Sequence, residues 1–145
     1  MRRYLVVANR TLGGDHILRA VRQRMHSEPC EFWIVVPAVR PASTRTEDRS
    51  YGSDAGDYGW AESGELFAQQ RLDRELQRLH EAGADADGEV GDADPYKAVS
   101  RTMADKKFDE IILSTLPRAR SRWLRQDLPR KLQRFGIPVT EIVSD

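Results

Sequence analysis

The chain has 145 residues, of which 39% are apolar, and its 23 basic and 23 acidic side chains give a formal net charge of zero. This length and apolar content are enough for one hydrophobic core, and we expect a single domain over residues 1–145. The balanced charge excludes a general electrostatic attraction for nucleic acid or for an anionic membrane, so we expect neither as a partner. The single cysteine excludes an internal disulfide and a zinc site built from cysteines.

Hydropathy gives an expectation about the cell compartment. The longest apolar run, residues 32–39, has eight residues and contains Pro37, whereas a membrane-spanning helix needs about 20. Arg2 and Arg3 precede only five apolar residues, which are too few for the core of a signal peptide. We therefore expect a cytoplasmic protein.

Short apolar runs alternate along the chain with longer segments of helical spacing. This alternation is typical of a parallel sheet covered by helices. Most of the runs are continuous and β-branched, as in strands buried on both faces. Residues 84–90 are acidic and contain a glycine, so we expect that strand at a sheet edge, where charge discourages unwanted pairing. The predicted strands are residues 4–8, 31–36, 84–90, 109–114 and 139–143.

Four helices are predicted between these strands. The first two are residues 15–25 and 62–82, and Gly83 favours a left-handed end to the second. Asp94 is expected to cap the third helix, with Pro95 at its first position. Asp127 is expected to cap the last helix. The predicted order is βαβαβαβαβ.

Residues 40–60 fit no element. They contain no Ile, Leu, Val, Met or Phe and are rich in Gly, Ser, Thr, Asp and Arg. We expect a flexible loop within the domain, either disordered or acting as a lid.

The turn after the first strand is the first candidate site. In an open parallel sheet, ligands bind beyond the carboxyl ends of the strands, where the strand order reverses. Asn9 and Thr11 lie in this turn, and Gly13 and Gly14 would let backbone N–H groups approach an anion at a helix N-terminus. A tight turn with a helix cap explains the same residues equally well, because no known phosphate-binding pattern is present.

The loop after the fourth strand is the second candidate site. Arg118, Arg120, Ser121 and Arg122 lie in it and could hold a phosphate through charge-assisted hydrogen bonds. Alternatively, they form a solvated basic flank that balances residues 81–94, which have six carboxylates and no Lys or Arg.

Catalytic and metal-binding groupings are missing from the sequence. His16, His26 and His80 fall on separate predicted helices without ligand spacing, so we expect surface or boundary positions and no metal site. Cys30 leads into a buried strand, where a thiol is usually inert. Ser114 lacks the context of an activated nucleophile. We expect no catalytic residue and no enzyme.

With these elements in place, the chain resembles the universal stress protein family over nearly its whole length, and most closely the actinobacterial branch. The resemblance is carried by the segments YLVVANRTLGGDHIL, GDADPYKAVSR, FDEIILST and SRWLRQDLPRKLQRFGIPVTEIV. It implies a three-layer α/β fold, Rossmann-like, of the adenine nucleotide alpha hydrolase-like type. The five parallel strands would have the order 3-2-1-4-5, with four helices and a ligand cleft at the junction of strands one and four.

Nucleotide-binding members of that family carry G-x2-G-x9-G-[S/T] after the fourth strand. The three glycines and the hydroxyl residue of that motif fall here on Ser114, Pro117, Asp127 and Leu128. Pro117 has no N–H to donate, and the carboxylate of Asp127 would repel phosphates. The family's ribose-binding aspartate corresponds to Asn9, and its adenine contact at the end of the second strand falls near Val36. The resemblance therefore implies that ATP binding is weak or lost.

Three functions remain open on these grounds. The first is a non-catalytic stress-response or regulatory protein whose arginine loop accepts another small anion or a protein partner. The second is a sensor of ATP or AMP in which Arg118, Arg120 and Arg122 replace the glycine cradle. The third is a small nucleotide-hydrolysing or nucleotidyl-transfer enzyme.

The last predicted strand suggests a homodimer, because the family commonly pairs subunits through it. The strand is short and β-rich and would have one unpaired side, which could pair with its copy about a twofold axis. Replacing Thr140 with proline would test this if its N–H faces the partner. A monomer whose edge is guarded by Glu141 and Asp145 is the alternative. The candidate dimer residues are Val139, Thr140, Glu141, Ile142 and Val143.

Overall fold

The computed structural model describes residues 1–8, 15–38, 54–115 and 127–143, and only the backbone of residues 54–64. Among these residues, no helix combines the length and the apolar character needed to cross a membrane.

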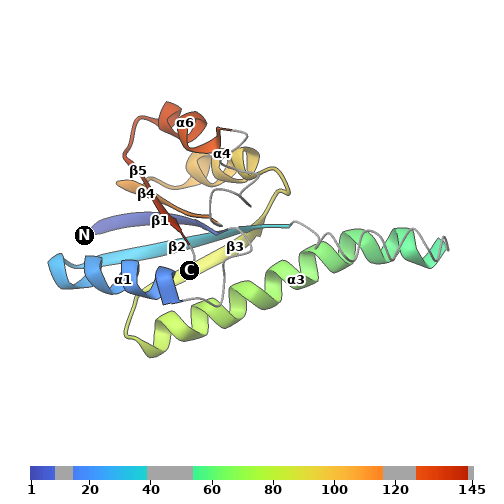
Figure 1. The fold of residues 1–145 in the computed structure, drawn as a ribbon, viewed down its shortest axis with the longest axis horizontal. Helices are drawn as coiled ribbons and strands as arrows, with labels where there is room; N and C mark the ends of the chain where they lie inside the picture. Colours follow the sequence, from blue (N-terminus) through green and yellow to red (C-terminus); the bar gives the residue numbers. More distant parts are fainter. Residues whose placement is uncertain (9–14, 39–53, 116–126, 144–145) are drawn as a thin grey trace.

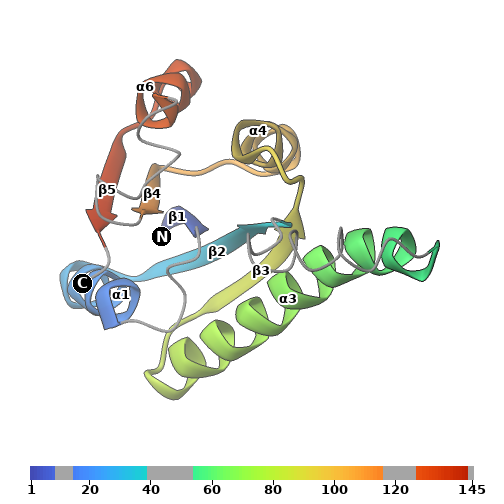
Figure 2. The same ribbon diagram turned by 45° about the vertical axis from the view of Figure 1, so that its right-hand side comes forward.

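The described residues form a five-stranded, all-parallel sheet with helices on both faces (Figures 1 and 2). The strand order is β3-β2-β1-β4-β5, as expected. The strands are β1 (Arg2–Ala8), β2 (Cys30–Pro37), β3 (Ala86–Gly91), β4 (Glu110–Thr115) and β5 (Val139–Val143). The three-layer α/β fold is therefore confirmed, and the last strand has the predicted bounds.

Two pairs of helices cover the two faces of the sheet. α1 (Asp15–Ser27) and α3 (Asp54–Glu81) lie on one face, and α4 (Pro95–Asp105) and α6 (Leu128–Leu132) lie on the other (Figure 1). A 3-10 turn, η1 (Gln133–Phe135), follows α6. This arrangement results from crossovers that run outward in both directions from the central strand β1.

Each face has its own hydrophobic core because side chains alternate along a strand. In β1, Tyr4, Val6 and Ala8 face α1 and α3, while Leu5 and Val7 face α4 and α6. Burial on both faces explains why the central strands are continuous apolar runs in the sequence.

The predicted N-cap of the third helix and the predicted left-handed end of the second helix at Gly83 are confirmed. The Asp94 side chain accepts hydrogen bonds from the backbone N–H groups of Tyr96 and Lys97, at 2.9 and 3.4 Å. Gly83 and Gly136 have φ angles of +87° and +80°, a left-handed conformation that glycine adopts without a Cβ penalty.

The prediction of a loop over residues 40–60 is wrong for its last part. α3 begins at Asp54 rather than near residue 62, and its amino-terminal part extends beyond the sheet (Figure 2). Residues 54–60 contain no proline, and lengthening an existing helix avoids the unfavourable nucleation step. The lack of an apolar stripe before residue 62 was therefore not a sign that the helix begins there. The rest of the predicted loop, residues 40–53, lies outside the described residues.

The expected cap of the last helix is also wrong in its mechanism. Asp127 occupies the N-cap position of α6, but its side chain accepts no hydrogen bond from the helix. Its backbone has φ 60° and ψ 35°, a left-handed conformation. An N-cap side chain reaches the helix N–H groups from extended backbone, so this conformation prevents capping.

Asp127→Gly is expected to raise the free energy of unfolding by about 0.5 kcal/mol. Glycine removes roughly 1–2 kcal/mol of left-handed strain, partly offset by the greater freedom of glycine in the unfolded chain. The lost ion pair with Arg130, at 3.6 Å between exposed side chains, contributes little. Urea unfolding measures the change. Asp127→Ala is the control, because it loses the ion pair and keeps the strain, and a less stable glycine variant would contradict the expectation.

Candidate functional site

The sheet has its topological switch point between β1 and β4. These two strands are neighbours, with Ala8 paired to Ser114 at their carboxyl ends. The chain leaves β1 toward α1 on one face, whereas α6, on the other face, is the next described helix after β4. Ligands of open parallel sheets bind at such a point.

The structure places three of the predicted site residues. Val36 is buried near the end of β2, Ser114 is buried at the end of β4, and Asp127 is exposed before α6. β1 lies between the strands that carry Val36 and Ser114. The other candidates lie outside the described residues: Asn9, Thr11, Gly13, Gly14, Arg118, Arg120, Ser121 and Arg122.

A buried histidine contacts the switch point. His16 Nε2 lies 2.8 Å from Ser114 Oγ, and the two residues are 5% and 0% exposed. The expectation of a surface or boundary position for His16 is therefore wrong, and His16 and His26 share α1 rather than lying on separate helices. His16 precedes Ile17 and lies four residues before Ala20, so it falls on the buried stripe of that helix.

This hydrogen bond joins the first turn of α1 to the last residues of β4. A ring nitrogen can donate to a hydroxyl or accept from it, so the pair satisfies two polar groups that would be costly to bury alone. Because both side chains are buried, the contact fixes α1 against the carboxyl end of β4.

An acidic residue of α3 is buried near the start of α1. Glu75 is 1% exposed, and its Oε2 lies 3.5 Å from Arg78 Nη1. Arg78 Nη2 lies 2.8 Å from Oδ1 of Asp15, the first residue of α1. The sequence contained a signal for Glu75 that was missed, because it lies three residues after Leu72 and four before Leu79 on the buried stripe.

A second hydroxyl at the end of β4 is buried on the opposite face. Thr115 is fully buried, and its Oγ1 has no hydrogen-bond partner in the part of the chain that the structure describes. Because side chains alternate, it lies on the face of Ile111 and Leu113, under α4 and α6. Buried polar groups are nearly always paired, so this hydroxyl is an exception among the described residues.

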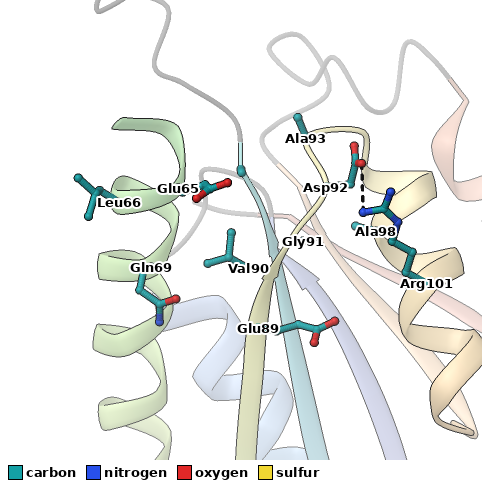
Figure 3. Close-up of a pocket in the computed structure, with 11 residues that line it drawn as sticks. Glu65, Leu66, Gln69, Glu89, Val90, Gly91, Asp92, Ala93, Ala98 and Arg101 are labelled. Carbon is teal, nitrogen blue, oxygen red and sulfur yellow. Dashed lines mark ion pairs between the residues drawn. The ribbon is translucent and has the colours of Figure 1, made fainter. Parts of the chain in front are cut away.

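A cavity of about 1000 Å³ lies away from the switch point, at the carboxyl ends of β2 and β3. It opens between α3 and α4 (Figure 3). Neither this cavity nor its lining was predicted from the sequence. Its described lining consists of Ala38, Glu65, Leu66, Gln69, Glu89, Val90, Gly91, Asp92, Ala93, Ala98 and Arg101.

The remaining titratable and nucleophilic side chains of the described residues form no further site. Cys30 is a buried free thiol, and burial raises its pKa. His80 Nε2 lies 2.7 Å from the carbonyl oxygen of Ala86. Within the described ranges, no group of three His, Cys, Asp or Glu side chains is placed to hold a metal ion.

Neither a family model nor a curated protein matches this chain. The resemblance to the universal stress proteins therefore rests on the sequence segments quoted above and on the strand order. A strand order indicates a fold and not a function, because unrelated functions share folds.

Proposed function

We propose that the protein is a non-catalytic regulatory protein of the universal stress type, acting in stress response, whose cleft at the switch point binds adenine nucleotides weakly or not at all. The strand order and the position of the switch point support the resemblance. The proposed ligand is a small anion or a segment of a partner protein.

The burial of the Ser114 side chain and its hydrogen bond to His16 are the main support for this proposal. Ser114 occupies the first glycine position of the nucleotide-binding motif, where a phosphate cradle would use bare backbone. Its side chain is buried and bonded to His16 at 2.8 Å, so the end of β4 is filled. At the last glycine position, Asp127 keeps a glycine-like φ of 60° but adds a carboxylate that repels phosphates.

The buried hydroxyl of Thr115 favours a second candidate, an ATP or AMP sensor. An unpaired hydroxyl at the switch point would be satisfied by a ligand oxygen. In this alternative, the arginines of residues 118–122 supply the charge that the glycine cradle lacks.

Calorimetry with Mg-ATP separates the two candidates. We expect a dissociation constant in the micromolar range or weaker, which is about −8 kcal/mol or less favourable. A nanomolar constant would contradict the proposal. Thr115→Val is the matched variant, because it keeps the shape and removes the hydroxyl. If the protein is a sensor, this variant weakens binding, and otherwise it leaves the weak affinity unchanged.

A second measurement uses the protein as purified. After denaturation, chromatography of the supernatant is expected to show no stoichiometric adenine nucleotide. A co-purifying nucleotide near one per chain would favour the sensor, since only a tight complex survives purification.

A further inference from the structure

The outer edge of β3 has no partner strand among the described residues. β3 pairs only with β2 among the described strands. The Phe32 N–H donates to the Asp85 carbonyl, and the Ala38 N–H donates to the Gly91 carbonyl. Because alternate residues of a strand direct their backbone groups to opposite sides, the odd-numbered residues of β3 bond to β2. The backbone groups of Ala86, Gly88 and Val90 lie on the outer edge.

Side chains already occupy the first half of this edge. His80 Nε2 contacts the Ala86 carbonyl at 2.7 Å, and the Gly88 N–H donates to Asp87 Oδ1 at 2.8 Å. No residue in the described ranges bonds to the Gly88 carbonyl or to the backbone groups of Val90. Within the described part of the chain, only the carboxyl-terminal half of the edge is therefore left for pairing.

The large cavity surrounds this open half. Its lining comes from α3, from residues 89–92 and from α4, so it lies on both faces of the edge strand (Figure 3). On the side of α3, Leu66 is 60% exposed and Val90 points toward that helix (Figure 3). On the side of α4, Glu89 accepts a hydrogen bond from the Thr102 hydroxyl at 2.9 Å. Both sides of the strand therefore present polar side chains, Glu65 and Gln69 from α3 and Glu89 and Arg101 on the side of α4.

The charges of the lining favour a cation. It contains three carboxylates, Glu65, Glu89 and Asp92, against one guanidinium, Arg101. Arg101 is bound only loosely, because its ion pair with Asp92 spans 3.6 Å and its side chain is 74% exposed. Acidic side chains on an edge repel most strands, and the same charges would attract a strand that carries lysine or arginine.

We propose that residues 88–92 are a docking site for an extended basic segment of another protein, which adds to the sheet beside β3. Its backbone would bond to the Gly88 carbonyl and to both backbone groups of Val90, as in other strand additions. Side chains alternate along such a segment. An apolar residue would therefore contact Val90, and its basic neighbours would lie near Glu89 and Asp92.

The test uses the full-length protein and a dye-labelled pentapeptide of alternating valine and arginine, capped at both ends. Fluorescence anisotropy is expected to show saturable binding that weakens with salt, and hydrogen exchange is expected to slow at the Val90 amide.

A pentapeptide of alternating valine and glutamate is the control and should not bind. Equal binding of both peptides, or no slowing at Val90, would overturn the proposal. Full competition by arginine amide at equal concentration would also overturn it, since the site would then take a free amine.

Two variants test the site directly. Val90→Pro removes the outward N–H without removing a bond to β2, and it should lower the peptide affinity by at least roughly tenfold. Glu141→Pro on the opposite edge strand is the matched control, because its N–H also lies on an outer edge, and it should leave the affinity unchanged.

The second variant changes charge and not backbone. Glu65→Gln combined with Glu89→Gln keeps an acceptor for the Thr102 hydroxyl and removes two negative charges. It should weaken binding about tenfold at low salt and less at high salt. It keeps the proposal testable if Val90→Pro does not fold. An unchanged affinity in the charge variant would overturn the proposal.

Discussion

Replacing Gly88 with alanine is expected to lower the free energy of unfolding by about 3 kcal/mol, the upper end for overpacking a well-packed core. A Cβ at this position would meet the carbonyl oxygen of Ile34 and, at 2.9 Å, Cδ1 of Leu72. The first contact is with backbone of the neighbouring strand, which cannot rotate away. β2 and β3 would have to separate at this point, and the Leu72 side chain of α3 would also have to shift.

Thermal unfolding measures this effect, with an expected fall in Tm of roughly 10 °C for a chain of this size. Gly136→Ala is the control. A Cβ there meets nothing within 4 Å, but φ is +80°, so only backbone strain of about 1 kcal/mol is added. If both variants lose the same stability, the close approach of β2 and β3 at Gly88 is not what the substitution disrupts.

The strands were predictable because burial on both faces leaves a strong trace in sequence. Residues 4–8 and 111–113 are apolar without alternation, and a short run of this kind is typical of a strand covered by helices on both sides. The weak strand at 84–90 was also predictable, since its acidic residues suit an edge. Strand ends shifted by one or two residues, because terminal residues such as Arg2 pair in the ladder without being buried.

The polar contacts of the site were not predictable to the same degree. His16 and Glu75 lie on the buried stripes of α1 and α3, but a polar residue on such a stripe is equally compatible with a helix boundary. The partner of His16, Ser114, comes from a distant segment, whereas Glu75 contacts Arg78 one turn further along the same helix, and Arg78 in turn contacts Asp15 of α1. Such pairs become visible only when α1, α3 and β4 are assembled.

Asp127 illustrates a different limit. Aspartate before a helix favours an N-cap, but the cap depends on the φ and ψ angles of that residue, which the chain before it determines. The residue type at position 127 was consistent with capping. The left-handed backbone of Asp127 is not consistent with it.

The free edge of β5 bears on the oligomeric state, and its register changes the best variant for testing it. The Ile111 N–H donates to the Pro138 carbonyl, and Ile111 pairs with Val139. In a parallel ladder, the Thr140 N–H then bonds to β4 rather than facing outward. Thr140→Pro would therefore break the fold's own ladder, and Glu141 is the residue whose N–H lies on the outer edge.

We expect the protein to be a homodimer that pairs through the outer edge of β5, and we expect Glu141→Pro to be a monomer. Glu141 and Val143 are exposed on this strand, and β5 has no strand on its outer side among the described residues. Proline at position 141 removes one outward donor and strains the strand without removing a bond to β4.

Light scattering at micromolar concentration should give twice the chain mass of 16.5 kDa for the unmodified protein and a single chain mass for the variant. Val90→Pro, on the other edge, should stay dimeric. A mass near 16.5 kDa for the unmodified protein would instead show that the Glu141 carboxylate guards the edge against pairing, as charged side chains do on the edges of monomeric sheets.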